Sequence, residues 1–362
     1  PRLARTVFDL EAPRFLTATS LASGAVTSFV TTMKGCDERC SFCIVPYTRG
    51  PERYRPSAEI VEEIAALCGR GVREITLLGQ TVNSYRDPSG ALPRAPGADP
   101  ADPDESEFAA LLRAIGERVP SLLRLRYTSP HPRHLTPSLI RAHAEVGVLA
   151  RHVHLPVQSG SDRMLKRMIR RYTRADYLAR VARLREAVPG VTLSTDLIVG
   201  FPGETEADVE ATLSLVEEVG FLGVFGFKYS PRPHTPALKL GDDVPEAEKG
   251  ARLARVFALS EALLATHLAS LVGTTQDVLV EGPAKRALEA GGERATFTGR
   301  TARNEIVHLD DPAARGLVGE IVRVPIVRSL KHSLVAELDP ALRARAIEGA
   351  PKQGARSLPL VR

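Results

Sequence analysis

The sequence predicts an α/β protein in which six parallel strands and their helices form an open (β/α)6 barrel, followed by a small β-barrel. From Phe29 onward, short apolar runs alternate with longer segments of helical period, a pattern typical of a parallel sheet covered by helices. Beyond Gly273 the chain changes to short alternating runs separated by Gly and Asp, which indicates a small β-domain. Because strand-helix-strand crossovers are right-handed, six units curl into part of the barrel that eight units close.

The elements of the first part follow one another in regular order. The expected strands are 29–33, 74–78, 123–129, 152–157, 191–199 and 223–229. In the first long helix Ser57 can cap the free amides, and apolar residues fall on one face up to Cys68, before Gly69 ends it. Thr136, Thr173 and Thr205 mark comparable helix starts.

The change of pattern along the chain predicts four segments. Residues 1–21 are expected to be a linker, and residues 22–256 the barrel. Residues 270–338 form the β-domain, and residues 339–362 a frayed basic tail with little apolar periodicity.

Composition excludes several classes of protein. The 362 residues are 43% apolar and 25% charged, close to the globular average, so the chain is neither disordered nor fibrous. The longest uncharged run, residues 15–33, holds eight Ser or Thr among nineteen residues, which disfavours a membrane span. The given sequence shows no charged stretch followed by an apolar run and a cleavage site, so secretion is not indicated and a cytoplasmic protein without membrane contact is expected. The net charge of +5 permits contact with a polyanion without requiring it.

The strongest chemical signal is the spacing C-x3-C-x2-C formed by Cys36, Cys40 and Cys43 in a loop after the first strand. A structural zinc site normally has four Cys or His ligands, and no second C-x2-C pair completes one here. Three thiolates instead suit an iron-sulfur cluster with one iron open to another ligand. A zinc knuckle remains the alternative. The fourth cysteine, Cys68, lies on an apolar helix stripe and is expected to be a small buried residue.

With this loop, the chain from Val26 to Leu338 resembles the radical S-adenosylmethionine enzymes, and more closely their methylthiotransferase branch. The resemblance implies that Cys36, Cys40 and Cys43 hold a 4Fe-4S cluster and act as the catalytic metal ligands. It also implies that the open iron binds S-adenosylmethionine, which one electron cleaves to a 5'-deoxyadenosyl radical.

Further motifs follow successive strands in the order that this family shows: LLGQTVNSY from Leu77, YTSPHP from Tyr127, HLPVQSGSD from His154 and TDLIVGFPGET from Thr195. Each motif alone is also compatible with a tight turn. The cofactor-binding residues that the resemblance implies are Phe42, Gly79, Gln80, Ser129, Gln158, Ile198 and Gly200. A separate metal site at His131, His152 and His154 is conceivable, but we favour packing and hydrogen-bonding roles for them.

Two regions are candidates for contact with RNA. Residues 163–174 hold six basic and no acidic side chains, and Arg167 and Arg171 are expected to meet phosphates, the alternative being a solvated helix face. The β-domain resembles the TRAM domain, an RNA-binding barrel. By that resemblance its RNA-facing residues are Arg300, Arg303, Asn304 and Lys331, although the domain carries equal numbers of basic and acidic residues.

The resemblance implies a transferase that adds a methylthio group to carbon 2 of isopentenyladenosine, beside the anticodon of tRNA. The alternatives are a methylthiotransferase acting on threonylcarbamoyladenosine or on a ribosomal protein, and a non-catalytic RNA-binding fragment. The expected partners are tRNA and an electron-donor protein, and a monomer is expected.

Two departures from the family stand out. Residues 1–28 lack the cysteines of the auxiliary cluster that the family carries in an N-terminal domain. The resemblance therefore implies that residues 1–21 are a linker left from a missing N-terminal domain and that sulfur transfer is not expected of this chain alone. The second departure is His234, which replaces a usual glycine.

Overall fold

The computed structural model describes residue 22 and residues 24–92, 106–284 and 296–349. The chain divides into two compact units, residues 1–264 and 265–362. The predicted linker at 1–21 and the end of the predicted tail at 350–362 lie outside the described residues.

The first unit contains six parallel strands in two three-stranded sheets. The sheet orders are β1(Thr27–Thr31), β4(Glu74–Leu78), β5(Arg124–Tyr127) and then β6(His152–His154), β7(Thr192–Val199), β8(Gly223–Lys228). Two backbone hydrogen bonds, from Leu125 N to Val148 O (2.7 Å) and from Ala150 N to Leu125 O (2.9 Å), tie β5 to the segment directly before β6. The six strands therefore follow one another in chain order, which confirms the predicted open barrel.

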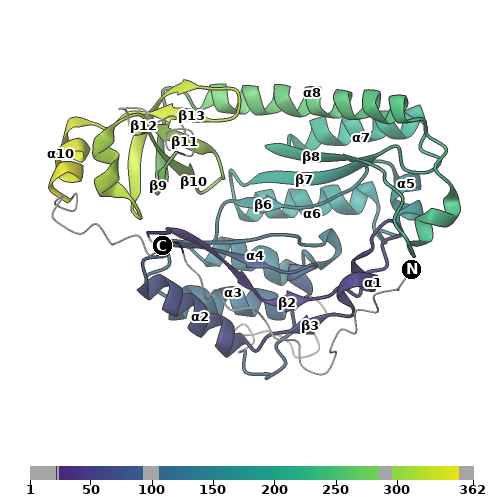
Figure 1. Ribbon diagram of the computed structural model, residues 1–362, viewed down its shortest axis with the longest axis horizontal. Helices are drawn as coiled ribbons and strands as arrows, with labels where there is room; N and C mark the ends of the chain where they lie inside the picture. The colour runs from purple at the N-terminus through teal and green to yellow at the C-terminus, as the bar shows by residue number, and fades with distance from the viewer. Residues whose placement is uncertain (1–21, 23, 93–105, 285–295, 350–362) are drawn as a thin grey trace, which may run out of the picture. The chain divides into compact units, whose positions relative to one another are not determined.

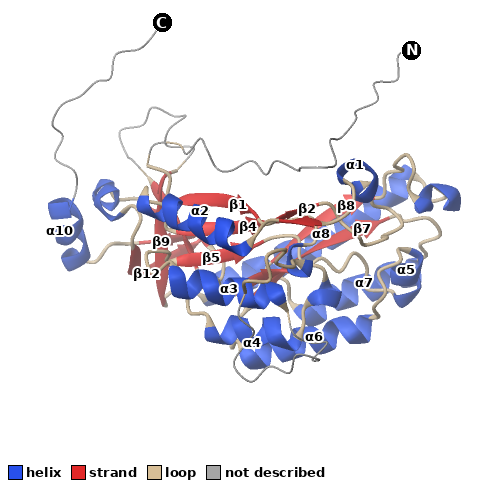
Figure 2. Ribbon diagram, turned by 90° about the horizontal axis from the view of Figure 1, so that it is seen from below, coloured by secondary structure: helices blue, strands red, loops and turns tan. Residues whose placement is uncertain are grey.

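Helices cover one face of these strands. Figure 2 shows α3, α4, α6 and α7 along one side of the sheets, and α2 contacts α3, α3 contacts α4, and α4 contacts α6. The long helices are α2(Ser57–Gly69), α3(Glu107–Arg118), α4(Pro137–Glu145), α6(Arg174–Ala187), α7(Glu206–Val219) and α8(Glu246–Ser270). The apolar face predicted for α2, including Ile60, Ile64 and Cys68, is buried in the main core.

Strand periodicity decides which side chains face the inside of the barrel. On β7, Leu193, Leu197 and Val199 are buried in the helix-covered core, whereas Asp196 and Ile198 alternate with them and are only partly buried. Because successive side chains of a strand point to opposite faces, Asp196 and Ile198 lie on the inner face.

Three of the four predicted helix starts are confirmed. The side chains of Thr136 and Thr173 accept from amides three residues on. Asp208 accepts from the backbone and hydroxyl of Thr205 (2.8 and 2.7 Å), which gives α7 its capping box. The prediction that Ser57 caps α2 is wrong, because Pro56 is the capping position and the Ser57 hydroxyl donates to Asp87 at 2.7 Å.

The first strand also differs from its predicted bounds of 29–33. The apolar run there is shared between β1 and the separate short strand β2(Met33–Lys34), which pairs antiparallel with β3(Arg53–Tyr54). Between β2 and β3 lies the cysteine loop, residues 35–52, which includes the short helix α1(Val45–Arg49) that the sequence pattern did not predict. An apolar run alone does not show at which residue the chain leaves one sheet and begins to pair with a different strand.

The second unit contains a closed five-stranded barrel in the order β10-β11-β13-β12-β9. Its strands are β9(Thr275–Pro283), β10(Phe297–Thr301), β11(Ile306–Leu309), β12(Ile321–Ser329) and β13(Leu334–Ala336), with the 3-10 helix η4(Pro312–Leu317) between β11 and β12 (Figure 1). In place of the frayed end that we expected after residue 339, Pro340–Gly349 form helix α10, with Ala346 buried. Its apolar residues, mostly alanines, do not repeat with a helical period that the sequence pattern could reveal.

Candidate functional site

The cysteine loop is held closed by its own backbone and by the end of β4. Gly35 has a φ of 79°, and a β-carbon there would lie 1.9 Å from the carbonyl oxygen of Pro51, so only glycine fits. Its amide donates to Gln80 Oε1 at 2.7 Å, and the amide of Cys36 donates to Gly50 O at 3.2 Å. Gln80, predicted to contact the cofactor, therefore also fixes the residue that precedes the first cysteine.

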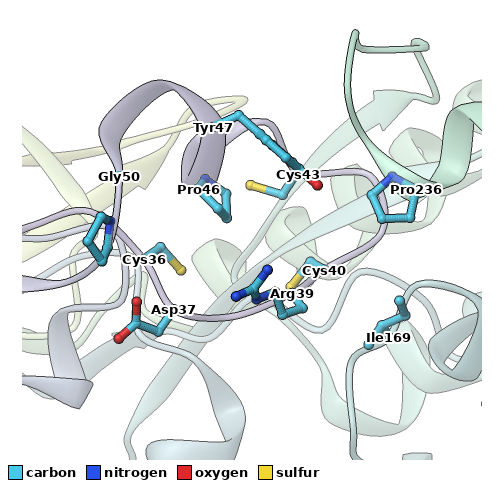
Figure 3. A pocket seen from close by; sticks show the side chains of 11 residues that line it. Cys36, Asp37, Arg39, Cys40, Cys43, Pro46, Tyr47, Gly50, Ile169 and Pro236 are labelled. Atoms are coloured by element: carbon cyan, nitrogen blue, oxygen red, sulfur yellow. The ribbon is translucent and has the colours of Figure 1, made fainter. Parts of the chain in front are cut away.

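Cys36, Cys40 and Cys43 line one cavity of about 420 Å³. Figure 3 shows their sulfur atoms directed toward the same space. The other lining residues come from the cysteine loop and from loops that follow later strands, such as Ile169 after β6 and Pro236 after β8. The cavity thus lies at the carboxyl ends of the parallel strands, where this class of fold places its chemistry.

The three thiols fit a metal cluster better than a single ion. Burial raises the pKa of Cys36 to about 11 and also raises the pKa of Cys43, so these two thiols stay protonated unless a metal deprotonates them. Among the described residues, only Glu38, His131 and His134 bring three ligand atoms within 4.8 Å of one another. At least one pair of cysteine sulfurs is therefore farther apart than the about 4.6 Å that two thiolates of one zinc ion span at most.

Glu38, His131 and His134 anchor the cysteine loop and do not form a metal site. Glu38 Oε1 lies 3.0 Å from His134 Nε2 and 3.7 Å from Arg133, and this hydrogen bond to His134 lowers the pKa of Glu38 to about 2. His131 Nδ1 accepts from the amide of Arg133 at 3.2 Å, so the proton of the neutral ring is on Nε2 and that nitrogen is not a ligand. Burial lowers the pKa of His131 to about 2, which keeps the ring neutral.

The other two histidines of the conceivable metal trio lie on β6, away from His131. His152 bonds to Thr192 and Ser194, while His154 bonds to Ser194 at 2.9 Å and lies 3.3 Å from Asp196. The three histidines do not come together, and the favoured hydrogen-bonding roles agree with these contacts.

Three predicted cofactor residues share an unusual backbone conformation at strand ends. Ser129, Gln158 and Gly200 have φ values of 60°, 77° and 67°. For Ser129 and Gln158 this left-handed conformation is strained, and such strain is concentrated at functional sites. Gly79, in contrast, has ordinary φ but no room, since a β-carbon would lie 2.6 Å from the side chain of Met33.

Phe42 and Ile198 are brought together although 156 residues separate them. Both pack against a small buried cluster near the cysteines, which consists of Met164, Met168, Phe201, Tyr229 and Ala237. This apolar surface beside the cysteine cavity suits the flat face of an adenine.

Most of the predicted basic run is engaged within the protein. Arg163 pairs with Asp208, Arg174 with Glu218, and Arg167 Nε donates to Pro202 O at 3.0 Å. Arg170 is buried, so the interpretation of the run as one phosphate-binding face is wrong for it. Arg171 is exposed, with a φ of 55°.

Three of the four predicted RNA-facing residues of the second unit, Arg300, Arg303 and Asn304, lie at the end of β10 or in the turn between β10 and β11. Arg300 lies 3.4 Å from Glu281, and Arg303 lies 3.1 Å from the buried Glu305. Asn304 has a φ of 79° in that turn, and Lys331 is exposed between β12 and β13.

The sequence interpretation missed three features of the site. Thr81 Oγ1 lies 2.9 Å from the sulfur of Cys36, and Arg170 Nη1 donates to the sulfur of Cys40 at 3.2 Å. Phe225 and Phe227 are more than half exposed on β8. The sequence signal that could have identified Phe225 and Phe227 is their alternation with Gly226, because it puts both rings on the same face of the strand.

The chain matches two family models: the Radical SAM superfamily over residues 30–216 and the TRAM domain over residues 269–338. A tRNA-2-methylthio-N(6)-dimethylallyladenosine synthase from Sorangium cellulosum is 68% identical over 99% of this chain and 74% of its own length. The chain therefore belongs to the Radical SAM superfamily. A second synthase, from Acidithiobacillus ferrooxidans, is 48% identical over 85% of this chain and 64% of its own length. Among solved structures, the radical S-adenosylmethionine methyltransferase TsrM from Kitasatospora setae matches 59% of this chain and 38% of its own with 20% identity and a TM-score of 0.46.

Radical SAM proteins use a 4Fe-4S cluster and S-adenosylmethionine. The three cysteine sulfurs, spread around one cavity without a fourth cysteine, fit such a cluster. No helix in the described part of the chain is long and apolar enough to cross a membrane.

Proposed function

We propose that this chain carries the radical chemistry and the RNA binding of a tRNA methylthiotransferase that acts on carbon 2 of N6-dimethylallyladenosine, also called isopentenyladenosine. The observation that carries this proposal is the set of three cysteine thiols around one cavity at the carboxyl ends of the strands. The relatives named for this reaction, 68% and 48% identical, support the choice of substrate.

In this proposal Cys36, Cys40 and Cys43 hold three irons of the cluster. The bound cluster and S-adenosylmethionine supply the electron and the adenosyl radical that removes hydrogen from an unactivated C–H bond. Phe42 and Ile198 offer an apolar surface to the adenine of the cofactor. Ser129, Gln158 and Gly200, which have left-handed backbone conformations at strand ends, are the further residues proposed to contact the cofactor.

The inner face of the second sheet offers a place for the target base. A β-carbon at Gly226 would meet Leu253 and Phe257 of α8, so its neighbours Phe225 and Phe227 point away from that helix. Phe225 makes an edge contact with His154, which lies beside Asp196. Exposed aromatic rings next to hydrogen-bonding groups are suited to stack on a base and contact its edge.

Two experiments test the proposed function. Anaerobic reconstitution of the protein with iron and sulfide should give a coloured protein that cleaves S-adenosylmethionine under reducing conditions. Cys40→Ala should lose both the iron-sulfur absorbance and the cleavage, because one iron loses its thiolate. Cys68→Ala is the matched control, since Cys68 lies on α2 outside the cavity. Zinc uptake without iron would instead support a non-catalytic RNA-binding protein.

The substrate is tested in the organism. Mass spectrometry of digested tRNA from a strain without this gene should show loss of the 2-methylthio form and accumulation of N6-dimethylallyladenosine. Unchanged modified adenosines would point to a ribosomal-protein substrate, and loss of methylthiolated threonylcarbamoyladenosine to the related tRNA reaction. An electron-donor protein and a monomeric state remain predictions.

A further inference from the structure

Arg170 is a buried cation that faces the sulfur of Cys40. Its side chain is 5% exposed, in the segment between α5(Asp162–Arg167) and α6. Nη1 donates to Cys40 Sγ at 3.2 Å, Nη2 donates to Pro156 O at 2.9 Å, and Nε donates to the Tyr172 hydroxyl at 3.0 Å. Each of the three guanidinium nitrogens therefore donates a hydrogen bond, and one of the three acceptors is a sulfur.

The surrounding protein fixes this guanidinium in place. The Tyr172 hydroxyl donates onward to Val157 O at 2.8 Å, and the Arg170 carbon Cζ lies 5.3 Å from the centre of the Tyr172 ring. Ile169 and Arg171, on either side, have left-handed φ values of 57° and 55°. A β-branched residue rarely adopts this conformation, so the turn is strained and held by its contacts.

The charge balance of the site suggests what Arg170 faces when the protein is loaded. A guanidinium stays protonated, and a buried charge without a counter-charge costs several kcal/mol. Among the described residues no carboxylate forms an ion pair with Arg170, and its remaining acceptors are neutral oxygens. The group at Cys40 is then the candidate anion, and a cysteine becomes a thiolate when it binds a metal.

We propose that Arg170 is a positioning residue that raises the reduction potential of the cluster through its hydrogen bond to Cys40. The proposal rests on the proposed function, in which Cys40 is a cluster ligand. Reduction adds one negative charge to the cluster, and a fixed cation at a ligand sulfur stabilises the more negative state more strongly. Hydrogen bonds to ligand atoms tune metal sites in the same way.

The test is a redox titration of the reconstituted protein, followed by the EPR signal of the reduced cluster. Arg170→Met should shift the reduction equilibrium at least tenfold toward the oxidised cluster, which is 59 mV for a one-electron couple. Arg170→Lys should show a smaller shift in the same direction, because it keeps the charge and loses the directed bonds. Arg183→Met, which removes an exposed cation of α6 outside this turn, should leave the potential unchanged.

Iron content separates the possible failures. If the unaltered protein takes up no iron, the proposed function fails. If Arg170→Met carries the same iron as the unaltered protein and has the same potential, the role of Arg170 is overturned while the function stands. If Arg170→Met takes up no iron, the test moves to Arg170→Lys and Tyr172→Phe. Tyr172→Phe removes the hydrogen-bond acceptor of Arg170 Nε and should lower the reduction potential of the cluster. If neither variant shifts the potential, the proposal is overturned.

Discussion

At Gly200, which the family resemblance assigns to cofactor binding, the protein itself leaves no room for a β-carbon. Its φ is 67°, and a β-carbon would lie 2.2 Å from Cγ of Lys249. Lys249 has little freedom to move, because it is buried and its Nζ pairs with Asp242 at 2.6 Å. The glycine is therefore required for packing whether or not a cofactor binds.

We expect Gly200→Ala to lower the free energy of unfolding by about 2–4 kcal/mol, from backbone strain together with the clash against Lys249. The matched control is Gly220→Ala at the end of α7, which has a left-handed φ of 59° but open space around the new β-carbon. It should cost about 1 kcal/mol, from strain alone. Urea unfolding measures both variants, and equal losses would contradict the clash.

The exposed rings of β8 give a second prediction for individual residues. If Phe225 stacks on the target base, Phe225→Ala should weaken binding of substrate tRNA about 5- to 150-fold, the range expected for one base-aromatic stack. Cleavage of S-adenosylmethionine without tRNA should stay the same. Phe257→Ala, on the opposite side of β8, is the control. Equal binding by both variants would place the base elsewhere.

At the scale of elements, the start of helix α2 depends on the carboxylate of Asp87, which lies in the segment that follows β4. Asp87 accepts from the amide and hydroxyl of Ser57, at 3.2 and 2.7 Å, and from Ser89. Burial alone would raise the pKa of Asp87, but the hydrogen bonds from Ser57 and Ser89 outweigh it and lower the pKa from 3.8 to about 2.

This shift predicts how stability depends on pH. Because the pKa is lower in the folded state, the contribution of Asp87 is present above pH 3.8 and is lost as the pH falls toward about 2. Asp87→Asn should cost about 2 kcal/mol near neutral pH and flatten the acid side of the stability profile. Urea unfolding at several pH values checks this, with Glu62→Gln on the exposed face of α2 as control. A profile as steep as that of the unaltered protein would refute the role of Asp87.

Elements were predictable where the side chains themselves carry the pattern. The strand period and the capping threonines are local signals, so β4 has its predicted bounds, and α6 and α7 begin directly after their predicted capping threonines, Thr173 and Thr205. The cap of α2 was wrong because its partner, Asp87, lies 30 residues away in the sequence. The helix α1 was missed because its five residues are too few to show a period.

The candidate site was predictable to the same extent. The cysteine spacing predicted three metal ligands, and the structure brings these three residues to one cavity. The order of the motifs predicted the strand ends. Arg170 could not be singled out, because it is one of six basic residues in a run of twelve, and only the fold decides which of them turns inward. The usual glycine replaced by His234 proved tolerable, since the histidine adopts a φ of 67°.

At the scale of the whole molecule, the second unit is expected to supply affinity for tRNA and the first unit the chemistry. We predict that Lys331→Glu weakens tRNA binding about tenfold and reduces the salt dependence of binding by about one phosphate contact. Cleavage of S-adenosylmethionine without tRNA should be unaffected.

The control for that experiment is Arg323→Glu, an exposed basic residue of the same barrel that lies outside the predicted RNA-facing set. Fluorescence anisotropy of labelled tRNA at several salt concentrations measures both variants. An equal loss in the two would mean that net charge, and not a specific surface, governs binding.

The left-handed turn around Arg170 has a consequence for engineering. Ile169 sits in a conformation that a glycine adopts without strain. Ile169→Gly would relieve that strain, but it would also give the unfolded chain more freedom and remove a side chain that lines the cysteine cavity. Selection for heat resistance would therefore gain little at this position, while the turn that holds the guanidinium would loosen.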